Sequence, residues 1–209
     1  MTVAADGSGL TVTAASVGEG LTWSPDGNEI AVASGTTLSV LRPDGSVVWT
    51  TQLAAPTPGD PRPNFLEPAW SPSGSTIVVP AVDYGGTSRI YSFPAAGGAA
   101  RLILDSGQYE SPSDVSISPD GLQLAFSASA GSSYVIAVAK VDGTAPTTLY
   151  TLPPTQRVTS STTWTPDGAR ILFSATITET TEEIFTIRAA GGTPTRLTQP
   201  PGSSRAPNV

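Results

Sequence analysis

The chain has 209 residues and a net charge of −7, with 38% hydrophobic and only 13% charged residues. It has no cysteine and no histidine, which excludes disulfides, thiolate or imidazole metal sites and Ser-His-Asp triads. Its ten Lys and Arg residues are scattered and no apolar run approaches the length of a membrane span, so we expect neither nucleic-acid binding nor membrane insertion.

The first predicted element is a strand over Leu10–Ala15, which follows an Asp6-Gly7 turn. The start of the chain lacks the basic and apolar regions of a signal peptide. A five-residue motif then recurs four times, each copy 47 residues after the one before: WSPDG at Trp23, WSPSG at Trp70, ISPDG at Ile117 and WTPDG at Trp164. A fixed period of this size indicates repeats that share a continuous core.

Each repeat contains four short runs rich in β-branched residues, separated by Gly, Pro, Asp and Ser turns, and no segment has helical periodicity. In chain order the expected strands are Leu21–Ser24, Glu29–Ala33, Thr37–Leu41, Val47–Gln52, Glu67–Ser71, Thr76–Val82, Arg89–Phe93, Arg101–Leu104, Asp114–Ser118, Gln123–Ser127, Tyr134–Val141, Thr147–Leu152, Thr162–Thr165, Arg170–Ala175, Glu183–Arg188 and Thr195–Thr198. Four such strands form an antiparallel meander of the size of a propeller blade.

The pattern predicts an all-β protein, a β-propeller with four four-stranded antiparallel blades and a surplus N-terminal strand. The expected blades span residues 21–53, 67–104, 114–152 and 162–198. We expect residues 1–20 to be an outer strand of a preceding or closing blade. Residues 199–209 should lead into a missing blade.

The acidic and aromatic residues of the repeated motif are interpreted as structural. In the S/T-P-D-G element Pro fixes φ, Asp bonds a nearby backbone N–H and Gly accepts positive φ, so a tight hairpin is expected. Ser73 replaces the aspartate in the second copy, which preserves turn chemistry but not a carboxylate. The tryptophans should fill the space between neighbouring blades rather than stack on a ligand.

The motif and the segments that follow it resemble the TolB-type repeat, a WD-repeat-like propeller repeat. The most similar segments are Ile184–Thr198 (IFTIRAAGGTPTRLT) and Ile90–Leu104 (IYSFPAAGGAARLIL). The resemblance covers nearly the whole chain and implies a bacterial module that binds a protein or peptide partner, in the periplasm or outside the cell. The same repeat also builds the propellers of prolyl-oligopeptidase-like enzymes.

Members of this family usually have six to eight blades, whereas four are counted here. The chain could be cut from a larger propeller, two chains could join into an eight-bladed ring, or four blades could close alone. We expect a fragment or an engineered piece that self-associates into a larger ring, as a homodimer or another homo-oligomer, through open apolar blade faces.

A non-catalytic scaffold or binding module without cofactor or metal is therefore the expected function. The alternative is an accessory propeller that gates substrate for a prolyl-oligopeptidase-like hydrolase whose catalytic domain is absent. The chain itself has no G-x-S-x-G elbow and no histidine. A carboxylate enzyme is disfavoured, because Glu182 and Glu183 are adjacent on a strand and should point to opposite faces.

Propellers bind partners at the mouth of the central channel, on loops between blades and on the loops that join the second and third strands. Tyr, Phe and Arg are enriched at recognition hot spots. The residues of these loops that could bind a partner are Arg62, Asn64, Phe65, Glu67, Asp83, Tyr84, Tyr109, Glu110, Arg157, Glu179 and Glu182. The competing interpretation is that they are ordinary loop residues.

Overall fold

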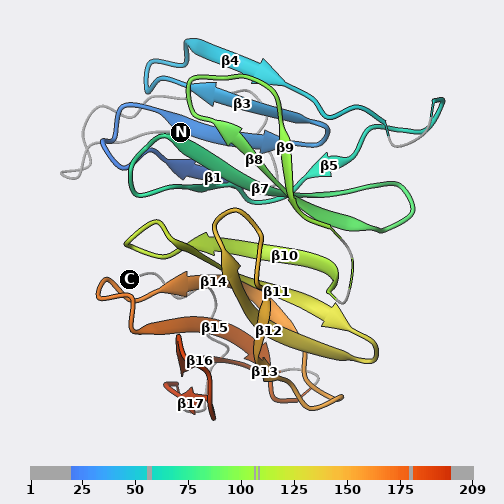
Figure 1. The fold of residues 1–209 in the computed structure, drawn as a ribbon, viewed down its shortest axis with the longest axis vertical. Coiled ribbons are helices and arrows are strands. Elements are labelled where there is room, and N and C mark those ends of the chain that lie inside the picture. The colour runs from blue at the N-terminus through green and yellow to red at the C-terminus, as the bar shows by residue number, and fades with distance from the viewer. Residues whose placement is uncertain (1–19, 56–57, 106, 108, 179–180, 199–209) are drawn as a thin grey trace. The chain divides into compact units, whose positions relative to one another are not determined.

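The computed structural model describes residues 20–55, 58–105, 107, 109–178 and 181–198. These residues form four antiparallel sheets and, within these ranges, no helix (Figure 1). The chain divides into two compact units. Among the described residues the first unit comprises 20–86 and 91–101, and the second comprises 87–90 and 102–198. The surplus strand expected in residues 1–20 and the lead-in expected in 199–209 fall almost entirely outside the described residues.

The four sheets are the blades of a β-propeller, and in each of them the strands follow chain order. Their strands are β1 (Gly20–Trp23), β2 (Ile30–Ser34), β3 (Thr37–Leu41), β4 (Val47–Thr51), β5 (Asn64–Phe65), β6 (Ala69–Trp70), β7 (Thr76–Val82), β8 (Ser88–Pro94), β9 (Arg101–Leu104), β10 (Glu110–Ile117), β11 (Gln123–Ala130), β12 (Ser133–Lys140), β13 (Thr147–Thr151), β14 (Val158–Trp164), β15 (Arg170–Thr176), β16 (Glu182–Arg188) and β17 (Thr195–Arg196). The all-β propeller fold predicted from the repeat is confirmed.

In the first unit, the second blade packs against the first through buried side chains of their strands. One buried cluster joins Ala31 and Val40 of the first blade to Trp70 and Ile77 of the second. The Trp70 indole Nε1 donates a hydrogen bond to the carbonyl oxygen of Thr22 at 3.2 Å. Trp70 therefore packs between two blades, as the sequence predicted, and its polar atom is bonded there.

In the second unit, Trp164 has the same role. It lies in a core with Ala125 and Ile136 of the third blade and Ile171 and Phe173 of the fourth. Phe173 also stacks on the ring of Phe185, with 5.6 Å between ring centroids. Aromatic and β-branched side chains on facing sheets thus bury each other, which is the main stabilisation of stacked blades.

Trp23 differs from its two counterparts. It is 43% exposed, whereas Trp70 is 8% and Trp164 6% exposed. Leu21, which precedes it by two residues on the same side of β1, is 45% exposed. The expectation that every motif tryptophan is buried between blades therefore holds for two of the three.

The S/T-P-D-G turns share one hydrogen-bond network. In the third blade Asp120 accepts from the Ser118 hydroxyl at 2.5 Å and from the Leu122 N–H at 3.0 Å. The Ser118 hydroxyl in turn accepts from the N–H of Gln123, and Gly121 has a φ of 74°. Asp26 and Asp167 have equivalent bonds. These aspartates therefore serve as turn formers, and the positive φ explains the glycine.

Serine performs the same task in the second blade. The Ser71 and Ser73 hydroxyl groups are 3.1 Å apart, and the N–H of Ser75 lies 3.4 Å from the Ser73 oxygen. The Ser71 hydroxyl still accepts from the N–H of Thr76 at 3.0 Å. The network survives the loss of the carboxylate, with one longer bond.

Acid should weaken the fold through these turns. The hydrogen bond from the neighbouring hydroxyl, with further help from a backbone N–H, holds the pKa of Asp26, Asp120 and Asp167 below the ordinary value of 3.8. A carboxyl group whose folded pKa is lowered stabilises the fold above its unfolded pKa, and this stabilisation is lost as the pH falls through the folded pKa. We expect the free energy of unfolding to decrease below a pH of about 4.

Urea unfolding at a series of pH values would measure this loss. The control is the chain with Asp26→Ser, Asp120→Ser and Asp167→Ser, which copies the second blade. Its unfolding free energy should depend less steeply on pH in the same range. Equal acid dependence of the two chains would contradict the assignment.

The inner strands differ from expectation in their length. In the second blade the inner position is divided between β5 and β6, which both pair with β7, and Pro68 lies between them. β10 and β14 begin four residues earlier than the expected strands at Asp114 and Thr162, and each contains two register shifts. In β10, Ser111 and Asp114 have positive φ, so bulges continue this strand through polar sequence.

Candidate functional site

A groove lies at one end of the fourth blade, in the second unit. β14 and β15 are joined at their other end by the WTPDG turn, and the groove lies where β14 begins and β15 ends. The loop from β13 to β14 forms one wall and the residues that leave β15 form the other. These are the two kinds of loop in which the sequence predicted recognition residues.

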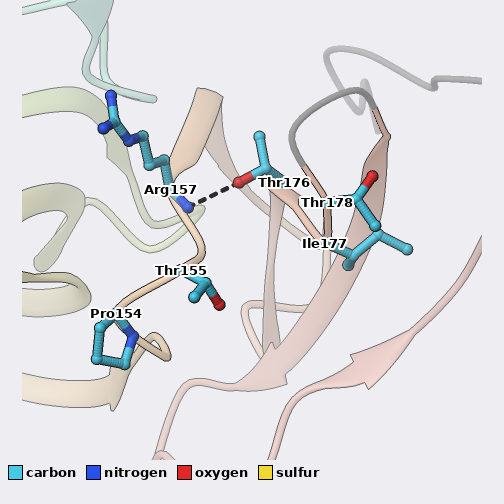
Figure 2. Close-up of a pocket in the computed structure, with 6 residues that line it drawn as sticks. All are labelled: Pro154, Thr155, Arg157, Thr176, Ile177 and Thr178. Carbon is cyan, nitrogen blue, oxygen red and sulfur yellow. Dashed lines mark hydrogen bonds between the residues drawn. The ribbon is translucent and has the colours of Figure 1, made fainter.

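The groove has a volume of about 640 Å³. Its lining residues are Pro154, Thr155, Arg157, Thr176, Ile177 and Thr178. Figure 2 shows Pro154 and Thr155 on one side, Ile177 and Thr178 on the other, and the Arg157 guanidinium standing apart from the other five side chains.

Backbone hydrogen bonds fix the two walls to each other. The Arg157 N–H donates to the Thr176 hydroxyl oxygen at 2.9 Å (Figure 2), and the Thr176 N–H donates to the Arg157 carbonyl oxygen at 2.9 Å. Across from them, Ile177 donates its N–H to the carbonyl oxygen of Thr181 at 2.9 Å. Arg157 is thus held by its backbone while its side chain is exposed.

Three threonine hydroxyl groups and one guanidinium are the polar side-chain groups of the described lining residues. The Thr176 hydroxyl accepts from the Arg157 N–H, and the Thr178 hydroxyl accepts from the Thr181 N–H at 3.1 Å. Both hydroxyl groups therefore accept a backbone N–H from within the protein. A guanidinium has donors only. The described lining residues include no carboxylate.

Two of the predicted glutamates are not among the described lining residues. Glu182 pairs with Thr176 in the β15–β16 ladder. Glu110 is the first residue of β10 in the third blade, and Arg157 directly precedes β14, the equivalent strand of the fourth blade. The Glu110 carbonyl oxygen accepts a hydrogen bond from the Ser129 hydroxyl. In the fourth blade the Arg157 N–H donates to the Thr176 hydroxyl oxygen instead. Within the described ranges, no three Asp, Glu, His or Cys side chains are placed to hold a metal ion.

Two of the predicted loop residues are buried instead. Phe65 belongs to β5 and is fully buried, with its ring edge-on to Phe93 at 5.9 Å between centroids. Tyr109 is buried edge-on against Phe126 at 5.3 Å, and its hydroxyl group lies 3.0 Å from the Thr148 hydroxyl. Both rings belong to blade cores, where they bury apolar area.

The other predicted residues of the first unit lie on its surface or are half-buried there. Tyr84 is 85% exposed at the β7–β8 turn, beside the half-buried Asp83. Arg62 is exposed and donates to the carbonyl oxygen of Leu53 at 3.2 Å. Asn64 and Glu67 are also exposed, on and after β5. Glu179 lies outside the described residues.

The structure adds lining residues that the sequence did not single out. Pro154, Thr155, Thr176, Ile177 and Thr178 are common residue types, and only their place in the predicted loop classes could have pointed to them. Of the predicted site residues that the structure describes, Arg157 alone lines this groove.

A family model for the TolB β-propeller domain matches residues 11–208, nearly the whole chain. The chain belongs to the TolB β-propeller domain family. The antiparallel blades and the 47-residue repeat of this TolB-type chain agree with that membership. No curated protein matches it in sequence.

Solved propellers share the fold at low sequence identity. The putative TolB from Agrobacterium tumefaciens has a TM-score of 0.64 and 16% identity, and the match covers 85% of this chain and 63% of that one. For TolB from Acinetobacter baumannii the TM-score is 0.59 and the identity 20%, with 86% and 40% covered. An oligogalacturonate lyase in complex with manganese has a TM-score of 0.64 and 16% identity, with 88% and 53% covered.

This TolB-type chain therefore spans between two fifths and two thirds of the length of these structures. The similarity establishes the propeller fold, which is shared by proteins named as TolB and by an enzyme. In the part of the chain that the structure describes, no helix has the length and the apolar character needed to cross a membrane.

Proposed function

We propose that this TolB-type propeller is a non-catalytic module that binds an extended segment of a protein or peptide partner. The groove beside Arg157 is the observation that carries the proposal. It combines an exposed arginine with apolar and hydroxyl side chains, on loops that a rigid blade holds in place. Pro154 and Ile177 offer apolar contact area, and the threonines can bond a peptide backbone.

The exposed Tyr84 and Arg62 are proposed as further contacts of the first unit. Tyrosine offers a large contact area at a low cost in conformational entropy, and both tyrosine and arginine are enriched at the hot spots of protein interfaces. No observation on the described residues favours an accessory propeller of a prolyl-oligopeptidase-like hydrolase over a binding module.

Peptide binding is expected to depend on the groove. The experiment screens a random hexapeptide library displayed on phage against the whole chain, and measures each selected peptide by fluorescence anisotropy. Thr155→Trp would fill the groove from its exposed wall, and should weaken binding about tenfold or more because the peptide loses its contact area.

The matched control is Thr195→Trp, which adds the same ring at an exposed position of β17 outside this groove. It should leave the affinity unchanged. If no peptide is selected, or if Thr155→Trp binds all selected peptides as tightly as the wild type, the proposed function is wrong.

We also propose that the face of the first blade that bears Trp23 mediates self-association. The same position is covered by a preceding blade at Trp70, whose indole has its acceptor there. A second copy of the chain could cover the exposed Trp23 and Leu21 in the same way.

We expect sedimentation equilibrium to show a mass that increases with concentration. Trp23→Ser should remove this increase, and Trp49→Phe should keep it. A wild-type monomer at all concentrations would contradict this.

A further inference from the structure

We infer that the fourth blade carries a separate binding site, a pocket that takes the phosphate group of a small molecule. It lies where β15 begins and β16 ends, and its volume is about 350 Å³. Its lining residues are Arg170, Arg188, Gly191, Gly192, Thr193 and Thr195. It shares no lining residue with the Arg157 groove, and the inference does not rest on the proposed function.

The two arginines stand opposite each other in the β15–β16 ladder. Arg170 and Arg188 are register partners, so their side chains leave the same face of the blade, where like charges repel. The Nε atom of Arg170 donates to the Thr186 hydroxyl oxygen at 3.1 Å, which holds one guanidinium in place. Thr186 in turn pairs with Thr195 of β17, which places Thr195 on the same face. An anion held by both guanidinium groups would offset their repulsion.

The other blades show that the fold does not need two cations at these positions. In each blade a turn glycine donates its N–H to the carbonyl oxygen of the residue equivalent to Arg188, and the inner strand donates an N–H to the carbonyl oxygen of the residue equivalent to Arg170. The equivalents of Arg170 and Arg188 are Glu29 and Arg42 in the first blade, Thr76 and Pro94 in the second, and Gln123 and Lys140 in the third. The fourth of these blades alone has two arginines here, in a chain whose net charge is −7. The shared turn therefore does not explain them.

The remaining lining groups add hydrogen-bond donors. Within the described ranges, the N–H groups of Gly192 and Thr193 have no acceptor, and the hydroxyl groups of Thr193 and Thr195 make no hydrogen bond. A phosphate group has acceptor oxygens in several directions, whereas those of a carboxylate lie in one plane. Two guanidinium groups, backbone N–H groups and hydroxyl groups around one pocket therefore match a phosphate better than a carboxylate.

The acidic residues nearest in the sequence leave the two arginines unpaired. Neither arginine forms an ion pair with a described residue. Asp167 is a turn former, and its pKa is lowered most by the hydrogen bond from the Thr165 hydroxyl and least by the charge of Arg170. Glu179 belongs to the connection at the opposite end of β15 and β16, and residues 199–209, which follow β17, contain no Asp or Glu. A ligand phosphate would thus not have to displace a carboxylate.

The size and lining of the pocket favour a small ligand. The other cations of the chain are scattered rather than gathered into a stripe that could follow a nucleic-acid backbone. The described lining residues have no apolar group larger than a threonine methyl. We therefore expect recognition of the phosphate itself, either free or at the end of a small monoester.

Isothermal titration calorimetry on the whole chain tests the site with inorganic phosphate and with glycerol 3-phosphate, at constant ionic strength. We expect phosphate to bind at least about tenfold more tightly than acetate or chloride. Arg188→Gln should weaken phosphate binding about tenfold or more, and Arg188→Lys should recover only part of the loss, because the guanidinium fork is missing. Arg101→Gln, at an exposed arginine of β9, is the control with the same charge change and should bind as the wild type.

Unfolding in urea separates loss of the site from loss of the fold. Without phosphate, Arg188→Gln should be at least as stable as the wild type, because it removes a like-charge pair. Added phosphate should raise the urea midpoint of the wild type and leave that of the variant unchanged. Tighter binding of glycerol 3-phosphate than of inorganic phosphate would identify a monoester as the ligand, and the reverse order would identify free phosphate.

Two tryptophan variants keep this inference apart from peptide binding. Thr195→Trp would fill the phosphate pocket and should weaken phosphate binding, whereas Thr155→Trp, which fills the Arg157 groove, should leave it unchanged. Phosphate that binds no more tightly than acetate, or that binds Arg188→Gln as tightly as the wild type, would overturn the inference whether or not the groove binds peptides.

Discussion

Replacing Arg196 with alanine is expected to lower the free energy of unfolding by about 3 kcal/mol, because it strips a buried carboxylate of its counter-ion. Glu183 is fully buried, and its Oε1 atom lies 2.7 Å from the Arg196 Nη2 atom. Its other oxygen accepts from the Thr198 hydroxyl, which also accepts from the N–H of Ile184 at 3.0 Å. The Arg196 Nε atom donates to the Thr198 carbonyl oxygen at 2.8 Å.

These bonds attach the two-residue strand β17 to β16, with which it shares only two register pairs. Equilibrium unfolding in urea measures the loss. The matched double variant, Glu183→Met with Arg196→Met, removes both charges and should lie within about 1 kcal/mol of the wild type, because no buried charge is left alone. If Arg196→Ala costs no more than the double variant, the ion pair does not stabilise the blade.

Gly143→Ala should destabilise the second unit by about 3 kcal/mol or more, from backbone strain and overpacking together. Gly143 has a φ of 84°, which an alanine adopts only with strain. A Cβ atom there would lie 1.5 Å from the carbonyl oxygen of Ile103, so the backbone of one of the two segments would have to move. Thermal unfolding followed by circular dichroism measures the effect.

Gly131→Ala separates the two causes. Gly131 also has a positive φ, of 62°, but a Cβ atom there would meet nothing within 4 Å. It should cost only about 1 kcal/mol, the strain of the backbone alone. Similar losses for the two variants would mean that the close approach to Ile103 is not what requires a glycine.

The sequence predicted the parts of the fold that depend on short-range chemistry. Pro and Gly set the four turns by their own conformational preferences, and Asp bonds the backbone in three of them. Ser73 shows that the turn tolerates a loss of charge. The strands next to these turns were found because β-branched runs adjoin them. The inner strands were underestimated, because polar runs such as residues 110–114 continue β10 through bulges that no local preference announces.

The candidate site was predicted less well for the same reason. Phe65 and Tyr109 were expected on loops because strand extent was underestimated, and the extended strands carry or adjoin them in the core. The pairing of Glu183 with Arg196 depends on the register of β16 and β17, which sequence spacing does not determine. Arg157 was recognised by its loop, whereas the threonines beside it became visible only through the folded groove.

The two ends of the fourth blade thus have separate tasks. At one end Thr165 and Asp167 form the turn between β14 and β15. At the other end the residues before β14 and those at and after the end of β15 line the groove. The described residues among 153–157 and 177–181 make none of the hydrogen bonds of the turn network. Such a division lets binding specificity diverge under selection while foldability is preserved, and it makes these two segments the natural positions at which to randomise the chain when new binding proteins are engineered from it.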